Sequence, residues 1–195
     1  SLEKLMPMIH LPVQSGSNRI LKSMNRNHTV EDYLSLITKI KKNNPLIEFS
    51  SDFIIGYPGE TENDFKETLN LLKTVKFINS FSFIFSARPG TPAANFKKID
   101  ENIAKDRLKI FQKTAEEVKM DFRKKLIEKS TSVMFENKIG NKDKFFGRDE
   151  YFNSVVVNSN KNLTGKIEKV YITEGNHNTL FGKINHKFQN RNFAA

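Results

Sequence analysis

Three segments of the sequence place serine, glycine and charged residues directly after a short run with the pattern of a β-strand. They are HLPVQSGS at 10–17, SDFIIGYPGET at 51–61 and the stretch at 81–91. Parallel α/β proteins bind ligands at the carboxyl ends of their strands, where side chains from several strands meet. The three turns therefore predict a small-molecule site on an α/β scaffold.

Alternation along the expected strands, 9–14, 48–55 and 80–87, predicts which side chains enter this site. We expect Phe81, Phe83 and Phe85 to pack against helices, which leaves the small and polar row facing a wide, hydrated interior. An ordinary closed barrel fills its interior with branched apolar residues instead. The alternative is a half-exposed sheet whose polar residues face water. The expected inward row contains Gln14, Asp52, Ser86 and Arg88.

The segments between and after these strands predict the remaining elements. Thr29 with Asp32, and Thr61 with Asp64, have the spacing of capping boxes that start helices. A long helix is expected at about 101–129. Five short strands separated by turn residues are expected at 132–136, 145–147, 153–157, 165–172 and 179–184, which is typical of a small oligonucleotide-binding barrel. We therefore predict an α/β domain over 1–126 and an all-β domain over 127–190.

Composition excludes several kinds of chemistry within this chain. The 195 residues contain no cysteine, so disulfides, zinc–thiolate sites and iron–sulfur ligation are excluded. The four histidines are scattered without metal-binding spacing, and no metal site is expected. No apolar run has the length needed to span a bilayer, so we expect a soluble cytoplasmic protein. Because the first expected strand follows Ser1 almost immediately, we also expect that the true amino terminus is missing.

The charge of the chain favours a polyanionic partner. The net charge is +10, and residues 126–195 alone have 11 Lys+Arg against 7 Asp+Glu. Basic surfaces bind RNA through the release of counterions. An equally simple explanation is a biased base composition of the genome, which enriches lysine and asparagine.

The motifs together resemble the radical S-adenosylmethionine methylthiotransferases. HLPVQSGS at 10–17 and SDFIIGYPGET at 51–61 match two motifs of that family, and SFIFSARPGTPAA at 82–94 is similar to the branch that methylthiolates the prenylated adenosine beside the tRNA anticodon. The β-rich segment resembles a TRAM domain, a small RNA-binding barrel. The resemblance implies the carboxy-terminal half of a radical-SAM partial barrel followed by a TRAM barrel.

The resemblance also implies roles for individual residues in binding S-adenosylmethionine. Ile54 would contact the adenine, and Gly56 would allow close approach of the backbone. Glu60 would orient the turn or cap the next helix, and Arg88 would pair with a carboxylate or, alternatively, form a salt bridge with Asp52. Asp52 itself stands where many radical enzymes have glycine. The implied cofactor-binding set is Gln14, Ser15, Asp52, Ile54, Gly56, Glu60 and Arg88.

The family's cluster-binding cysteines are absent from this chain. The resemblance implies two 4Fe-4S clusters whose ligands lie outside it, so we expect the chain alone to be catalytically inactive. The expected partner is the tRNA anticodon stem-loop, bound by a monomer. Phe145, Phe146, Tyr151 and Phe152 are candidates for stacking on bases, although such aromatics more often belong to a core. The candidates for phosphate binding are Lys142, Lys144, Arg148, Lys166 and Lys169.

Two alternatives stay open at this point. The first alternative is that the same chemistry acts on another tRNA adenosine or on an aspartate of a ribosomal protein, although the segment at 82–94 argues against both. The other alternative is a non-catalytic RNA-binding module in which the α/β half serves only as a scaffold.

Overall fold

The structure is a computed structural model that describes residues 6–140 and 143–184. It contains two compact units, which divide between Lys119 and Met120. The expected domain boundary after residue 126 stays a prediction. Among the described residues, no helix has both the length and the apolar character that crossing a membrane requires.

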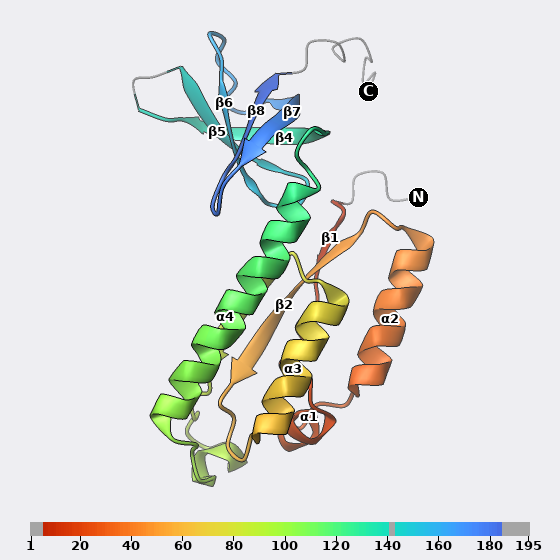
Figure 1. Ribbon diagram of the computed structural model, residues 1–195, viewed down its shortest axis with the longest axis vertical. Helices are drawn as coiled ribbons and strands as arrows, with labels where there is room; N and C mark the ends of the chain where they lie inside the picture. Colours follow the sequence, from red (N-terminus) through yellow and green to blue (C-terminus); the bar gives the residue numbers. More distant parts are fainter. Residues whose placement is uncertain (1–5, 141–142, 185–195) are drawn as a thin grey trace. The chain divides into compact units, whose positions relative to one another are not determined.

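The first unit is a parallel sheet of three strands in the order β1-β2-β3. Helices pack along this sheet (Figure 1). The first strand is shorter than expected, but Leu11 and Gln14 continue to pair with β2 through backbone hydrogen bonds. The elements are β1 (Met8–His10), α1 (Asn18–Ser23), α2 (Val30–Asn43), β2 (Glu48–Ile55), α3 (Glu62–Val75), β3 (Asn79–Ile84), the 3-10 helix η1 (Pro92–Asn95) and α4 (Glu101–Lys124), whose last residues belong to the second unit.

Both expected capping boxes are present. The Thr29 hydroxyl accepts the Asp32 N–H while the Asp32 carboxylate accepts the Thr29 N–H, and Thr61 and Asp64 do the same at the start of α3. Each box satisfies two backbone donors that the first turn of a helix leaves without intrahelical partners. The starts of α2 and α3 are therefore fixed by local sequence.

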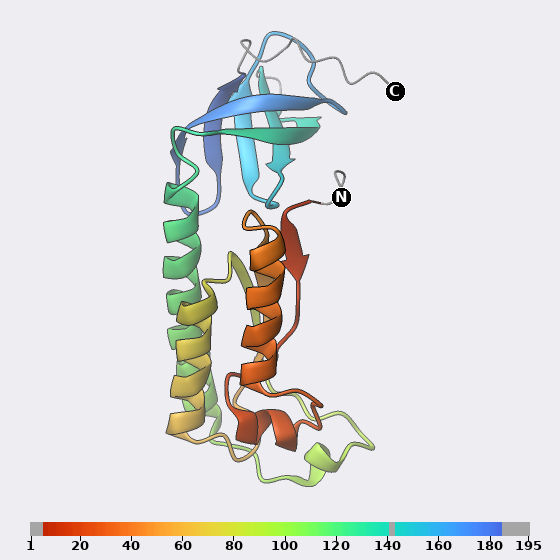
Figure 2. The same cartoon turned by 90° about the vertical axis from the view of Figure 1, so that its right-hand side faces the viewer.

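One face of the sheet is covered by helices and forms the core of the first unit (Figure 2). Phe49, Phe53 and Ile55 are buried there, as the alternation predicted. They pack with Leu72 from α3 and Phe111 from α4. The opposite face of β2 presents Asp52 and Ile54.

For the third strand, the prediction that the phenylalanine side chains pack against the helices was wrong. The register pairs Asp52 with Phe81 and Ile54 with Phe83, so these two phenylalanines share the helix-free face. Phe81 is 52% exposed and Phe83 is 59% exposed. Alternation fixes which residues lie on the same face of a strand, but it does not say which face a helix will cover. Here the serine row at positions 80 and 82 turns toward the helices.

The second unit contains a closed five-stranded barrel in the order β4-β5-β6-β8-β7. Its strands are β4 (Ser130–Lys138), β5 (Lys144–Asp149), β6 (Ser154–Asn158), β7 (Ile167–Gly175) and β8 (Leu180–Ile184). All five expected strands are therefore present. A separate core of buried residues, including Val133, Phe135 and Ile172, fills the barrel. The fold class is confirmed at this level: an α/β unit followed by a small β-barrel.

Candidate functional site at the carboxyl end of the sheet

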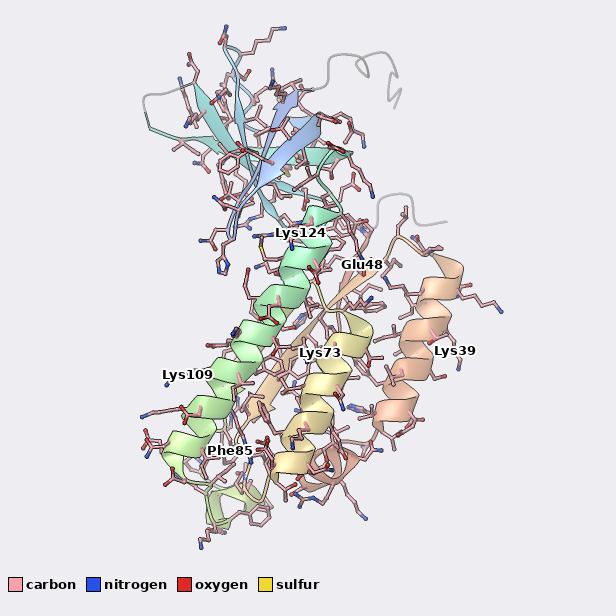
Figure 3. All side chains as sticks on the ribbon, in the orientation of Figure 1. Lys39, Glu48, Lys73, Phe85, Lys109 and Lys124 are labelled. Atoms are coloured by element: carbon pink, nitrogen blue, oxygen red, sulfur yellow. The ribbon has the colours of Figure 1, made fainter. Side chains whose placement is uncertain are left out.

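The candidate site lies at the end of the sheet that is opposite to the start of β2. Figure 3 shows Glu48 at that start and Phe85 at the far end. The Phe85 N–H donates to the carbonyl oxygen of Ile55 at 2.9 Å, and the Phe85 ring meets Tyr57 edge-on at 4.9 Å. The ends of β2 and β3 are thus joined just where the predicted ligand-binding turns begin.

A buried carboxylate fixes the turn after β2. Gly56 has a φ of 75°, and a Cβ added to it would lie 2.9 Å from the Cβ of Ala104. The Glu60 carboxylate accepts the Gly56 N–H at 3.2 Å and a hydrogen bond from Arg107 Nη1 at 2.8 Å. Glycine suits both this backbone conformation and this close approach. Glu60 therefore orients the turn through its side chain, and direct contact with a cofactor stays a prediction.

Arg107 lies on α4 and contacts this turn, and it was not among the predicted site residues. It is only 8% exposed, its guanidinium lies 5.5 Å from the centre of the Phe65 ring, and it also donates to the Glu60 carbonyl oxygen at 3.1 Å. Burial raises the pKa of the Glu60 carboxyl, and the hydrogen bond from Arg107 opposes that change. The sequence feature that could have indicated Arg107 is its position on the buried face of α4, as a charged residue between Ala104 and Phe111.

Gln14 joins the loop after β1 to the end of β2. Its N–H donates to the Asp52 carbonyl oxygen at 2.9 Å, and its own carbonyl oxygen accepts the Ile54 N–H at 2.9 Å. The φ of Gln14 is 75°, an uncommon conformation for a residue other than glycine. The structure therefore brings Gln14, Asp52 and Ile54 together through the backbone, as the sequence predicted for a shared site.

Ser15 serves to attach this loop to α3. It is 1% exposed, its Oγ lies 3.4 Å from Thr68 Oγ1, and it accepts the Ser17 N–H at 3.2 Å. The Gly16 N–H donates to the same Thr68 oxygen at 3.0 Å. The Ser15 hydroxyl is thus used within the fold, and its predicted role with a ligand stays a prediction.

Asp64 connects the same loop to the start of α3. Its carboxylate accepts the Ser17 hydroxyl at 2.6 Å and the Thr61 N–H at 2.7 Å, and it forms an ion pair with Arg19. Burial raises the pKa of this carboxyl, but the hydrogen bonds from Arg19, Ser17 and Thr61 outweigh it and hold the pKa well below the usual range. The ionised carboxylate is therefore part of the folded structure.

Asp52 points to the helix-free face of the sheet, where its partner is His10. The His10 Nε2 lies 3.4 Å from Asp52 Oδ1, and its Nδ1 lies 2.9 Å from Ser50 Oγ. The His10 ring also meets Phe81 edge-on at 6.0 Å. His10 was not among the predicted site residues. The signal was its place in the alternation, on the same face as Asp52.

Arg88 lies in the exposed loop after β3, away from any acidic partner that the structure describes. Its carbonyl oxygen accepts the Thr91 N–H at 3.2 Å and the Thr91 hydroxyl at 2.8 Å. The alternative of a salt bridge to Asp52 is therefore wrong. The guanidinium is available to a ligand, and pairing with a carboxylate stays a prediction.

The barrel distributes the predicted phosphate-binding residues over two strands. Lys144 and Arg148 lie on β5, Lys169 lies on β7, Lys166 directly precedes β7, and Lys142 lies outside the described residues. Arg148 Nε is 3.3 Å from Glu136, and Lys169 Nζ is 3.7 Å from Glu150. Pairs this exposed contribute little energy, so both cations remain able to exchange partners.

The four aromatic candidates differ sharply in exposure. Phe145 is 3% exposed and belongs to the barrel core, so for it a stacking role is wrong. Phe146 lies under the guanidinium of Arg148, 5.4 Å from ring centre to Cζ, and Tyr151 meets the ring of Phe122 at 5.1 Å. Phe152, in contrast, is 47% exposed.

Comparison with known families shows which class of protein this chain is similar to. Residues 2–72 match the model of the radical SAM superfamily. This segment contains the loop after β1, the turn after β2 and the network around Asp64. The family resemblance found in the sequence motifs is confirmed.

More particular relatives cover nearly the whole chain. It is 53% identical over 181 residues to the tRNA-2-methylthio-N(6)-dimethylallyladenosine synthase of Pelagibacter ubique, which aligns 93% of this chain with 41% of that protein. It is 44% identical over 182 residues to the protein of the same name from Wolbachia pipientis (92% and 41%), and 42% identical over 184 residues to that from Zymomonas mobilis (94% and 41%). The chain thus spans about two fifths of the length of these relatives.

Proposed function

We propose that this chain works as part of a radical-SAM methylthiotransferase that modifies tRNA. The reaction is the methylthiolation of the prenylated adenosine adjacent to the anticodon. The observation that carries the proposal is the 53% identity to a tRNA-2-methylthio-N(6)-dimethylallyladenosine synthase over 93% of the chain. The polar turns at the carboxyl end of the sheet support it, because α/β enzymes bind their cofactors at this edge.

The proposed cofactor is S-adenosylmethionine, and the residues present fit such a group. Ile54 offers an apolar surface to a base, and Arg88 has no acidic partner among the described residues. Gly56, whose Cβ position is filled by Ala104, allows the tight turn that follows Ile54. Gln14 and Asp52 would add polar groups to the site. Ser15 and Glu60 would act through the loops that they fix. When bound, this cofactor supplies the radical that removes a hydrogen atom from the adenosine ring.

The proposal includes two 4Fe-4S clusters whose ligands lie outside this chain, since the sequence has no cysteine. The chain's own part in the reaction is therefore binding and orientation. The chain by itself would not cleave S-adenosylmethionine. This division of labour is consistent with the share of the relatives' length that it spans.

We propose further that the barrel is a TRAM domain that binds the tRNA anticodon stem-loop, with the whole protein acting as a cytoplasmic monomer. The support for RNA binding is the net charge of +4 over residues 126–195 together with exposed cations on β5 and β7. Lys144, Arg148, Lys166 and Lys169, with Lys142, would contact phosphates. Such contacts make affinity fall steeply with salt.

A chimeric enzyme tests the proposed reaction. The aligned segment of the Pelagibacter ubique synthase would be replaced by this chain, and methylthiolated nucleosides in tRNA would be measured by mass spectrometry. Product formation is expected, and Gly56→Val, which places a branched side chain against Ala104, should abolish it. A folded chimera with intact clusters and no product would contradict the proposal.

The remaining alternative is a non-catalytic RNA-binding module. It predicts RNA binding by the chain, just as the enzyme does, but no product from the chimera. If the chimera instead modified a different adenosine or a ribosomal-protein aspartate, the reaction class would stand and the proposed target would be wrong.

A further inference from the structure

The turn between β5 and β6 exposes an aromatic ring on a backbone conformation that disfavours it. Phe152 has a φ of 62° and is 47% exposed. The left-handed region costs a residue with a bulky side chain roughly 1–2 kcal/mol, and glycine or asparagine adopts it more readily. Such strain in a surface turn persists only where the surrounding structure enforces it.

A buried polar network enforces this turn. Asp149 is 2% exposed, and its Oδ1 accepts the N–H groups of Tyr151 at 2.9 Å and Asn153 at 2.8 Å. Its Oδ2 accepts Asn153 Nδ2 at 2.9 Å, and Arg123 Nε donates to Asn153 Oδ1 at 3.1 Å. The position of Phe152 is therefore set by the backbone around it. The turn therefore presents the Phe152 ring at the surface, and the ring takes no part in the barrel core.

The turn that holds Phe152 directly follows β5, whose outer face has a row of basic and aromatic residues. Lys144, Phe146 and Arg148 alternate along that strand with the inward residues Phe145 and Asp149. The guanidinium of Arg148 lies over the Phe146 ring, and its Nη1 donates to the Phe152 carbonyl oxygen at 3.3 Å. A cation thus contacts the backbone of the residue that carries the exposed ring.

This combination matches the way proteins bind single-stranded nucleic acid. There, aromatic rings stack on unpaired bases while neighbouring cations contact the phosphates. The excess of positive charge in this half of the sequence favours a polyanion over a neutral or basic protein surface. The ion pair of Arg148 with Glu136 is exposed on both sides, 41% and 44%, so a phosphate can replace the carboxylate.

We propose that Phe152 is a nucleobase-stacking residue, and that Arg148 binds the phosphate next to the stacked base. The ligand is an unpaired base of an RNA loop. This inference rests on the proposed RNA-binding function of the barrel and adds the site at which a base is held. The alternative is that the Phe152 ring contacts a protein partner, and the test below distinguishes the two.

The absence of tryptophan from the chain allows a direct test. In Phe152→Trp, position 152 carries the only tryptophan, and stacking of a base on it should quench its fluorescence when an anticodon stem-loop RNA is added. A matched variant, Phe96→Trp, places a tryptophan at another exposed phenylalanine, 43% exposed, in the first unit. No comparable quenching is expected there.

Affinity measurements on the full chain complete the test. Phe152→Asn removes the ring but suits the left-handed backbone, so its thermal stability should equal or exceed that of the unsubstituted chain. Its RNA affinity should fall roughly ten-fold, with the salt dependence unchanged. Arg148→Gln should instead reduce the slope of log affinity against log salt by about one.

The possible results are distinct. Quenching at position 152 together with weaker binding by a stable Phe152→Asn supports the inference. Unchanged affinity in Phe152→Asn and no quenching in Phe152→Trp would overturn it while leaving RNA binding by the barrel intact, and would favour a protein partner for the ring. If the unsubstituted chain bound no RNA at low salt, the proposed RNA-binding function would fail as well.

Discussion

Asp64 shows how a single buried carboxylate holds the candidate site together. It caps α3, accepts the hydroxyl of Ser17 from the loop after β1, and pairs with Arg19. Each of these donors also stabilises the ionised form, which is why the pKa of the carboxyl lies well below its usual range. The loop that holds Gln14 therefore depends on a charge located on α3.

Replacing this carboxylate should have a cost that depends on pH. We expect Asp64→Asn to lower the free energy of unfolding by about 1–3 kcal/mol at pH 7, because the amide cannot accept all the hydrogen bonds. A depressed pKa gives stability that is present above the unfolded-state value, about 3.9, and is lost as pH falls toward the folded-state value. The difference between the two proteins should therefore shrink below pH 4 in urea unfolding.

The exposed Asp106 provides the control for this prediction. Its side chain is 68% exposed and forms an ion pair with Lys109. Asp106→Asn should change the free energy of unfolding by less than about 0.5 kcal/mol, both at pH 7 and below pH 4. Equal effects of the two substitutions at pH 7 would contradict the role assigned to Asp64.

At the residue scale, the sequence predicted the parts of the site that local patterns encode. Gly56 and Glu60 belong to a motif, and Thr61 with Asp64 has the spacing of a capping box. Arg107 comes from a helix more than forty residues further along the chain, and no local pattern marks its contact with Glu60. Partners that meet only after the chain has folded cannot be read from spacing along the sequence.

At the scale of elements, the packing of the first loop against α3 depends on Gly16. A Cβ added there would lie 2.5 Å from Thr68 Cα and 2.6 Å from the Glu67 carbonyl oxygen, both backbone atoms. Gly16→Ala should therefore displace the loop from the helix and destabilise the chain by about 2 kcal/mol or more. Chemical denaturation measures the loss directly.

A substitution at Gly59 is the control that distinguishes a steric clash from an unfavourable backbone conformation. It has a φ of 78°, and nothing lies within 4 Å of a Cβ added to it. Gly59→Ala should therefore cost only the conformational penalty, about 1 kcal/mol. If Gly16→Ala were as mild as Gly59→Ala, the close contact between the loop and α3 would not exist in solution.

The elements themselves were easier to predict than their orientation. The bounds of β2, Glu48–Ile55, follow from a run of apolar residues with period two between a proline and a glycine. Which row of β3 side chains lies toward the helices did not follow from the sequence, because the phenylalanine and serine rows alternate equally well in either orientation. The register with β2 decided it, and that register depends on long-range pairing.

At the scale of the whole molecule, the chain contains two hydrophobic cores with no buried residue in common. One includes Phe53, Leu72 and Phe111, and the other includes Val133, Ile172 and Leu180. The sequence predicted two domains from the change from helical spacing to short strands, with the boundary after residue 126. Because cooperative unfolding follows the contacts within a core, each unit should have its own transition.

Two matched truncations test this independence. Leu72 and Ile172 are both fully buried, and truncation of such a residue to alanine costs about 2–5 kcal/mol. Leu72→Ala should lower the transition of the α/β unit and leave the barrel unchanged, while Ile172→Ala should do the reverse. Amide hydrogen exchange followed by NMR reports both units in one sample, with amides of β2 and β5 as reporters. A loss of protection that spreads equally over both units in either variant would show a single cooperative domain, and the barrel could then not act as the separate module that the proposed RNA binding requires.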